Sequence, residues 1–237
     1  MKQAHHARMI VFNPCTAARP PKRKKKEIPV LSRDELQILL NALEGSRLYD
    51  IAFLAACTGM RRSEHLGLRW SDVDLEYKSL VITQTLEETR EHGMRIEATK
   101  TKSSQRRITL PAAAVLALQS WRRQQDEEHL KLGLGRDDKR LVFTRQDGDW
   151  YSPRSISHAF TRAVAKIDGL PRITLHGLRH THITHLLRDG VTIKAVSARA
   201  GHASVSTKLD TYGHLIDNME GSAADAVESW FTGASQD

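Results

Sequence analysis

The stretch TGMRRSEHLGLRWSDVD, residues 58–74, gives the strongest indication of how this chain folds. Gly59 is expected to cap the C-terminal end of a helix, because glycine readily takes the left-handed conformation found there. Arg61 follows two residues later, and Glu64 stands three residues after Arg61. The residues that we expect in the core are Leu66, Leu68, Trp70 and Val73, with Asp72 or Asp74 closing a turn.

Two helices are predicted ahead of this stretch. Ser32 and Glu35 have the spacing of a capping box, which marks the start of a helix. Apolar residues then recur at helical intervals, at Leu36, Leu39, Leu40 and Leu43. The second helix reaches Gly59 through Tyr49, Ile51, Ala52, Leu54 and Ala55.

Beyond the stretch, the pattern changes to strand type between residues 79 and 110. The short runs are LVIT at 80–83, RIEA at 95–98 and RRITL at 106–110, and together they predict one small antiparallel sheet. Pro111 suits the first position of a helix that continues towards Trp121. A turn at Gly133 and Gly135 and a short LVFT segment at 141–144 follow, and further helices are expected at about 153–167, 176–188 and 192–199. The predicted fold class is therefore mainly α with a small antiparallel β-sheet (α+β).

Composition excludes several classes of protein. The 237 residues include 40% hydrophobic residues, enough for a core, and no apolar run approaches the roughly 18 residues that span a bilayer. Two cysteines, Cys15 and Cys57, cannot form a disulfide framework, and the N-terminus lacks the apolar stretch of a secretory signal. We expect a protein of the reducing cytoplasm that does not contact membranes.

The net charge of +8 is unevenly distributed along the chain. Residues 1–26 contain eight basic side chains and no acidic one, including Lys22, Arg23, Lys24, Lys25 and Lys26. The residues from 214 onward contain five acidic side chains and no Lys or Arg. A basic, proline-containing head is typical of an extended, solvated segment, and it fits either a solubilising tail or a contact with the DNA backbone.

Four separated segments are rich in groups that bind phosphate. They are TGMRRSE at 58–64, KTK at 100–102, HGLRH at 176–180, and GH at 201–202 followed by Tyr212. Each segment taken alone is better explained by ordinary surface or packing roles. His176 and His180 have the i, i+4 spacing of a metal pair, but no acidic residue accompanies them as in HExxH, so we expect no metal site.

Together, TGMRRSEHLGLRWSDVD, TKTKSSQRRITLP, HGLRHTHITHLL and GHASVSTKLDTYGHL closely resemble the catalytic domain of the tyrosine recombinases, in particular phage and transposon integrases. The resemblance runs from about Leu31 to about Leu215. It departs from the family's usual pattern at Ala200, where Leu is usual, and at Lys208, where Thr is common. The resemblance implies the DNA breaking and rejoining fold of that family.

The resemblance also implies a role for each matching residue. Tyr212 falls on the nucleophile, Arg61 and Arg179 on the two arginines that clamp the scissile phosphate, and Glu64 on an acidic residue that orients the arginine. Lys100 falls on the lysine that protonates the leaving 5′-oxygen, although Lys102 lies on the same side of an extended strand and also reaches that position. His176 and His202 fall on the two remaining positions of the site.

These residue types suit a reaction that breaks and re-forms a phosphodiester bond. A guanidinium stays charged, binds two oxygens at once and needs no metal, so the expected site uses neither a metal nor a cofactor. The expected activity is site-specific DNA recombination or integration through a 3′-phosphotyrosyl intermediate. The alternatives are a DNA-binding remnant of an integrase that no longer recombines and, less favoured, a type IB topoisomerase.

The family implies a domain order and partners. Residues 1–30 are expected to be a basic linker left from a missing core-binding domain, in a fragment or a truncated reading frame. Residues 31–215 would form the catalytic domain, and 216–237 an acidic C-terminal helix or tail. Double-stranded DNA and a tetramer on DNA are the expected partners, in a nucleoid-associated cytoplasmic location. The C-terminal apolar residues would dock on a neighbouring subunit or fold back onto their own domain, and they are Ala223, Ala224, Val227, Trp230 and Phe231.

Overall fold

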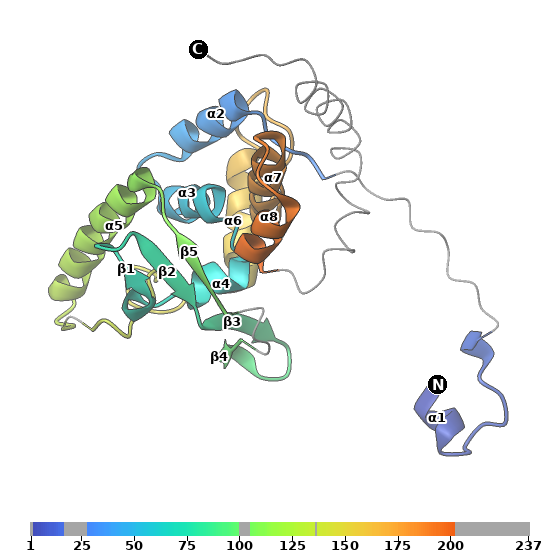
Figure 1. The fold of residues 1–237 in the computed structure, drawn as a ribbon. Helices are drawn as coiled ribbons and strands as arrows, with labels where there is room; N and C mark the ends of the chain where they lie inside the picture. The colour runs from blue at the N-terminus through green and yellow to red at the C-terminus, as the bar shows by residue number, and fades with distance from the viewer. Residues whose placement is uncertain (1, 17–27, 100–104, 136, 202–237) are drawn as a thin grey trace, which may run out of the picture.

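The computed structural model describes residues 2–16, 28–99, 105–135 and 137–201. Helices dominate these residues, and two small antiparallel sheets lie at the lower edge of the body in this view (Figure 1). The helices are α1 (Lys2–His6), α2 (Arg33–Leu43), α3 (Arg47–Thr58), α4 (Arg62–Gly67), α5 (Ala112–Lys131), α6 (Pro153–Val164), α7 (Leu175–Arg188) and α8 (Ile193–Ala200), with 3₁₀ turns η1 (Pro14–Thr16) and η2 (Trp70–Asp72). The strands are β1 (Val73–Asp74), β2 (Ser79–Ile82), β3 (Gln84–Thr89), β4 (Gly93–Ala98) and β5 (Arg106–Thr109). The predicted fold class is confirmed.

The first two helices of the body form where the sequence predicts them. Ser32 accepts a hydrogen bond from the backbone of Glu35, whose side chain accepts one from the backbone of Ser32, so the capping box is present. Helix α3 ends at Thr58, and Gly59 follows in the left-handed conformation with a φ of 64°. This turn directs the chain from α3 into α4.

The sheet prediction was incomplete, because the strands form two sheets. Strand β2 pairs with β1 and β5, whereas β3 pairs with β4 in a separate hairpin. Thr83 lies between β2 and β3, at the point where the chain changes from one pairing to the other. The segment at 141–144 forms only isolated bridges at Leu141 and Thr144, so it is not a strand.

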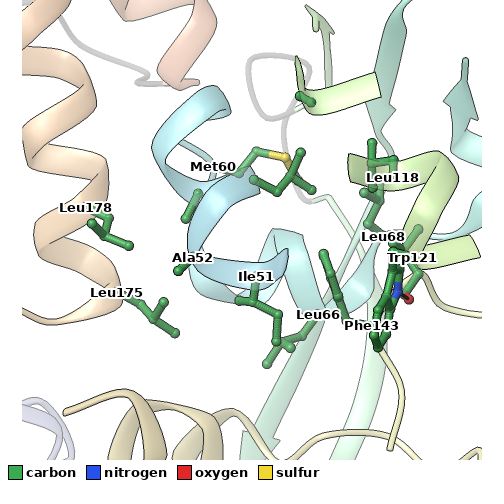
Figure 2. Close-up of a cluster of buried hydrophobic side chains, with 14 of the residues drawn as sticks. Ile51, Ala52, Met60, Leu66, Leu68, Leu118, Trp121, Phe143, Leu175 and Leu178 are labelled. Carbon is green, nitrogen blue, oxygen red and sulfur yellow. Dashed lines mark hydrogen bonds between the residues drawn. The ribbon is translucent and has the colours of Figure 1, made fainter. Parts of the chain in front are cut away.

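Helix α3 lies at the centre of the body. It contacts α2, α4, α5, α6 and α7 (Figure 1). Its buried residues Ile51 and Ala52 belong to the same apolar cluster as Leu66 and Leu68 from the stretch after α3. Figure 2 shows this cluster, in which Leu175 and Leu178 of α7 lie on one side of α3 and Leu118, Trp121 and Phe143 on the other.

Helix α5 is longer than its sequence pattern predicts. Pro111 occupies the N-cap rather than the first helical position, and the helix continues ten residues past Trp121 to Lys131. A buried amide holds this region together, because Gln125 accepts a hydrogen bond from Trp70 Nε1 at 2.7 Å and donates to Thr144 Oγ1 at 2.8 Å. The long helix therefore covers one side of the core.

Helix α7 is hydrogen-bonded to Leu31, which lies shortly before α2. The backbone N–H of Leu31 donates to Thr181 Oγ1 at 3.2 Å, and His185 Nε2 lies 2.8 Å from the carbonyl oxygen of Leu31. Helix α8 packs on the far part of α7 through Ile183, Leu187, Val196 and Ala200. Because α7 also contacts α3, these contacts fix α8 relative to α3. Within the described ranges, no helix is long and apolar enough to cross a membrane.

Candidate active site

Arg61 stands at the N-cap of α4, immediately after the turn at Gly59. Its Nη1 donates to Glu64 Oε1 at 2.8 Å, and its backbone N–H donates to Glu64 Oε2 at 2.7 Å. The side chain of Arg61 remains 38% exposed. Glu64 thus holds the guanidinium close to its own backbone while leaving part of it open to solvent.

Glu64 is almost fully buried and is shared by two arginines. Arg106, the first residue of β5, donates from Nη1 to Glu64 Oε1 at 3.0 Å and from Nη2 to Glu64 Oε2 at 2.8 Å. Burial alone would raise the pKa of Glu64, but the hydrogen bonds and charges of Arg106 and Arg61 lower that pKa to about 2. The carboxylate is therefore ionised at neutral pH.

Arg179 lies on the second turn of α7 and is also buried, with 2% of its surface exposed. Its Nη1 donates to the carbonyl oxygen of Gly59, and its Nη2 donates to the carbonyl oxygen of Ala200 at 2.7 Å. These bonds join the end of α3 to the end of α8. Arg61 is the more accessible of the two arginines.

The C-terminal end of α8 brings the arginines together. Three consecutive carbonyl oxygens there each accept a hydrogen bond from a different arginine, at a helix end that carries partial negative charge. The pairs are Arg106 Nε with Arg199 O, Arg179 Nη2 with Ala200 O and Arg61 Nη2 with Gly201 O, each at 2.7 Å. Guanidinium groups from β5, α7 and α4 thus meet directly before residue 202.

His176 lies in the first turn of α7, where Thr174 accepts a hydrogen bond from the backbone of Gly177 as the N-cap. The imidazole is exposed and makes an edge contact with His180, with ring centroids 4.7 Å apart. Desolvation and then the charges of Arg179, Arg61 and Arg62 lower the pKa of His176 below its usual value. These interactions favour a neutral His176 at pH 7, one turn before Arg179 on α7.

Four of the sequence-predicted positions lie in the described part of the chain, and the structure brings Arg61, Glu64, Arg179 and His176 together. The other predictions lie outside the described residues. They are Lys100, Lys102, His202, Tyr212 and the basic run Lys22, Arg23, Lys24, Lys25 and Lys26.

Two arginines of this region were missed by the sequence reasoning. Arg106 connects Glu64 with the end of α8, and Arg199 donates to His182 Nε2 at 3.2 Å and to the carbonyl oxygen of Cys57 at 2.9 Å. A signal for Arg106 exists in the sequence. It stands two residues before Ile108 in a predicted strand, so the two side chains share the inward face, where an arginine requires a partner.

The arrangement suits an anionic ligand that meets the exposed part of Arg61. Cationic groups are held in fixed positions by buried hydrogen bonds, and a neutral imidazole lies nearby. Such preorganised donors stabilise charge that develops on a phosphoryl group without reorganising during the reaction.

Comparison with known proteins places these residues in a family. The sequence profile of the phage integrase family matches residues 29–219. The tyrosine recombinase XerC-like protein of Caldanaerobacter subterraneus subsp. tengcongensis is 31% identical over 94% of this chain and 61% of its own length. The ICEBs1 integrase of Bacillus subtilis is 28% identical over 95% of this chain and 61% of its own length. The chain spans about three fifths of the length of these curated relatives.

Solved structures show the same fold. The Tn1549 transposon integrase in complex with transposon right end DNA superposes with a TM-score of 0.70 at 22% identity, over 90% of this chain and 70% of that one. XerA recombinase superposes with a TM-score of 0.60 at 27% identity, over 78% of this chain and 60% of that one. The described helices and sheets are thus arranged as in tyrosine recombinases.

Proposed function

Because the chain belongs to the phage integrase family, we propose that it is the catalytic part of a site-specific recombinase that cleaves and rejoins double-stranded DNA. One observation carries the proposal. Arg61 and Arg179 donate to the adjacent carbonyls of Gly201 and Ala200, directly before residue 202, and His176 lies one turn before Arg179 on α7. The DNA-bound Tn1549 integrase, which shares the fold, supports DNA as the substrate class.

In the proposed reaction, the Tyr212 hydroxyl oxygen attacks the scissile phosphorus. A bond forms between Tyr212 Oη and phosphorus, and the bond from phosphorus to the 5′-oxygen breaks. Lys100 gives a proton to the leaving 5′-oxygen, while the phenol proton passes to His176 or to the surrounding phosphate environment. The phenol has an ordinary pKa of about 10, so a cationic site that favours the phenolate assists the attack.

Arg61 and Arg179 are proposed to bind the non-bridging oxygens, on which the transition state gathers charge. His202 is proposed to complete the donor set, and Glu64 to keep Arg61 in place. Loss of one well-placed donor in such a site costs about 3 to 4 kcal/mol of transition-state stabilisation. The reaction assigned to these residues uses no metal and no cofactor.

The covalent phosphotyrosyl link conserves the energy of the phosphodiester. The 5′-hydroxyl of a second DNA strand can therefore reverse the first step and complete strand exchange without ATP.

Lys102 remains the alternative proton donor. Substituting each lysine and measuring cleavage of DNA with a 5′-thiolate leaving group separates them, because that group leaves without a proton and restores only the variant that lacks the donor.

The proposal includes a tetramer on DNA, because exchange between two duplexes uses four active sites. The apolar residues between Glu220 and Phe231 are proposed to dock on a neighbouring subunit. Light scattering of a chain that ends before Asp217 tests this contact. Loss of association on DNA supports docking in trans, whereas unchanged association contradicts it.

The proposed organisation places a basic linker at residues 1–30, the catalytic domain at 31–215 and an acidic segment at 216–237. The linker is proposed to follow the DNA backbone without reading its sequence. The protein would act where the DNA lies, in the cytoplasm and in association with the nucleoid.

The test is covalent capture of DNA. The chain is incubated with a pool of nicked duplexes that carry a randomised central segment, so that cleavage releases a short strand and traps the protein on DNA. We expect a covalent adduct with the wild-type chain and none with Tyr212→Phe. Binding without any adduct would indicate a remnant that no longer recombines, and relaxation of supercoiled plasmid by the monomer without intermolecular joining would indicate a topoisomerase.

A further inference from the structure

Arg106 contacts both Glu64 and the C-terminal end of α8 at the candidate site, although the sequence motifs assign it no role. Its guanidinium spans both oxygens of Glu64, at 3.0 and 2.8 Å, and its Nε donates to the carbonyl oxygen of Arg199 at 2.7 Å. Its side chain is 7% exposed, whereas that of Arg61 is 38% exposed. Arg106 is thus placed behind the site rather than at its surface.

Arg106 and Arg61 both bind the carboxylate of Glu64. Each carboxylate oxygen accepts one hydrogen bond from Arg61 and one from Arg106. A carboxylate with four donors in a buried position has no freedom to rotate. The position of Arg61 is therefore set by a carboxylate that Arg106 holds from the other side.

The end of α8 is fixed by the same guanidinium. Besides the bond to the Arg199 carbonyl, Arg106 lies so close to Gly201 that a Cβ at that residue would be 2.4 Å from Arg106 Nη1. Gly201 also has a φ of 65° and accepts the hydrogen bond from Arg61 Nη2. Arg106 therefore contacts both groups that fix the guanidinium of Arg61, which are Glu64 and the end of α8.

From these contacts we infer that Arg106 is a positioning residue for the cleavage reaction, which aligns Arg61 on the scissile phosphate through Glu64 and the α8 carbonyls. The inference rests on the proposed function and extends it to a residue of the stretch TKTKSSQRRITLP to which the family resemblance assigns no role. Arg106 acts on the rate of cleavage and not on the binding of DNA, because it is buried beneath the groups that meet the phosphate.

The experiment measures cleavage and binding separately. The single-turnover rate of covalent adduct formation and the Kd for DNA are determined on the nicked duplex recovered by covalent capture. We expect Arg106→Met to lower the cleavage rate by about 100-fold, the effect of one misplaced transition-state donor, and to change the Kd by less than about twofold.

A double-mutant cycle tests whether Arg106 affects the cleavage rate through Arg61. If Arg106 acts through Arg61, then Arg61→Ala combined with Arg106→Met cleaves no more slowly than Arg61→Ala alone. The matched control is Arg140→Met, because Arg140 is buried to a similar degree, at 9% exposed, and pairs with Asp126 in another part of the body. We expect this control to lower the melting temperature without lowering the cleavage rate by more than about twofold.

Arg106→Lys covers the case in which the methionine variant fails to fold. Lysine keeps the charge, but its ammonium cannot span both Glu64 oxygens and reach the Arg199 carbonyl. We expect a folded variant that cleaves at least about tenfold more slowly than wild type.

Three results contradict the inference while leaving the proposed function intact. They are wild-type cleavage by Arg106→Met, wild-type cleavage by Arg106→Lys, and losses from Arg61→Ala and Arg106→Met that multiply in the double variant. A wild-type chain that forms no adduct overturns the proposed function itself, and the inference with it.

Discussion

Glu64 is the residue on which the acid stability of the site depends. Its pKa of about 2 lies below the usual value, so its contribution to folding is complete above about pH 4.5 and is lost as the pH falls towards 2. We expect Glu64→Gln to lower the free energy of unfolding by about 3 kcal/mol at pH 7, because two arginines lose a buried partner. Urea denaturation at a series of pH values should show this difference shrinking below pH 4.5. A difference that does not change with pH would contradict the assigned pKa.

His65 also makes stability fall as the pH falls, through a side chain that is neutral in the folded protein. It is fully buried beside Glu64, neither ring nitrogen has a hydrogen-bond partner among the described residues, and burial lowers its pKa to about 4. Between about pH 6.5 and 4, the unfolded chain binds a proton at His65 that the folded chain does not, so stability falls as the pH falls.

His65→Leu should remove that proton uptake. We expect the free energy of unfolding to fall less steeply between pH 6.5 and 5 than in wild type, by up to about 1.4 kcal/mol per pH unit. His182, whose pKa is also about 4, stays in place and retains its own share. Identical slopes for the two proteins would show that His65 does not titrate differently in the folded and unfolded chains.

At the scale of elements, the close contact between α4 and β3 positions the start of α4. Gly67 ends α4, and a Cβ there would lie 2.8 Å from backbone atoms of Thr85 and Leu86. Backbone atoms cannot move aside as the end of a flexible side chain can, so a larger residue would push α4 away from β3. Arg61 and Glu64 would move with the helix.

Gly67→Ala should therefore reduce both stability and cleavage. We expect a loss of about 1 to 3 kcal/mol in the free energy of unfolding, the usual cost of overpacking a tight contact. Gly135→Ala is the matched control, because a Cβ at Gly135 meets nothing within 4 Å. Thermal unfolding and adduct formation should be affected in the first variant and unchanged in the second. Equal behaviour of the two would contradict the role given to the α4 and β3 contact.

The sequence predicted those elements whose signals are local. The capping box of Ser32 and Glu35 and the left-handed Gly59 depend on residues close in sequence, and both are present. The division of the strands into two sheets was missed, because it depends on which distant strand pairs with each side of Thr83. Arg106 was missed for the same reason, since its partners lie 42 and 93 residues away along the chain.

At the scale of the whole molecule, the placement of charge predicts how DNA affinity responds to salt. Residues 1–26 contain eight basic side chains and no acidic one, whereas the rest of the chain is closer to balance. A segment that neutralises phosphates releases counterions, at about 0.9 per contact on duplex DNA. The basic head should therefore account for much of the salt dependence.

Replacing Lys22, Arg23, Lys24, Lys25 and Lys26 with glutamine tests this. We expect weaker binding to every duplex, and the slope of log affinity against log salt should become less steep by up to about 4.5. The preference among DNA sequences should not change, because backbone contacts do not read bases. An unchanged salt slope would indicate that the head is a solubilising segment without DNA contacts.

The family match over most of the chain and the hydrogen bonds of the site arginines both support the proposed active site. The family profile covers residues 29–219, and the curated relatives are matched over about three fifths of their own length. Within that range, Arg61 and Arg179 both donate to carbonyl oxygens at the end of α8, although the two are more than 100 residues apart in sequence. The roles of Lys100, His202 and Tyr212 remain predictions from the motifs.

The proposed reaction breaks DNA through Tyr212. The most direct measurement is to isolate the covalent adduct, digest its DNA and protein, and identify by mass spectrometry the amino acid that carries the nucleotide and the end through which it is attached. We expect a nucleotide joined through its 3′-phosphate to the Tyr212 oxygen, with a free 5′-hydroxyl on the released strand. A 5′-linked nucleotide, or attachment to any other residue, would contradict it.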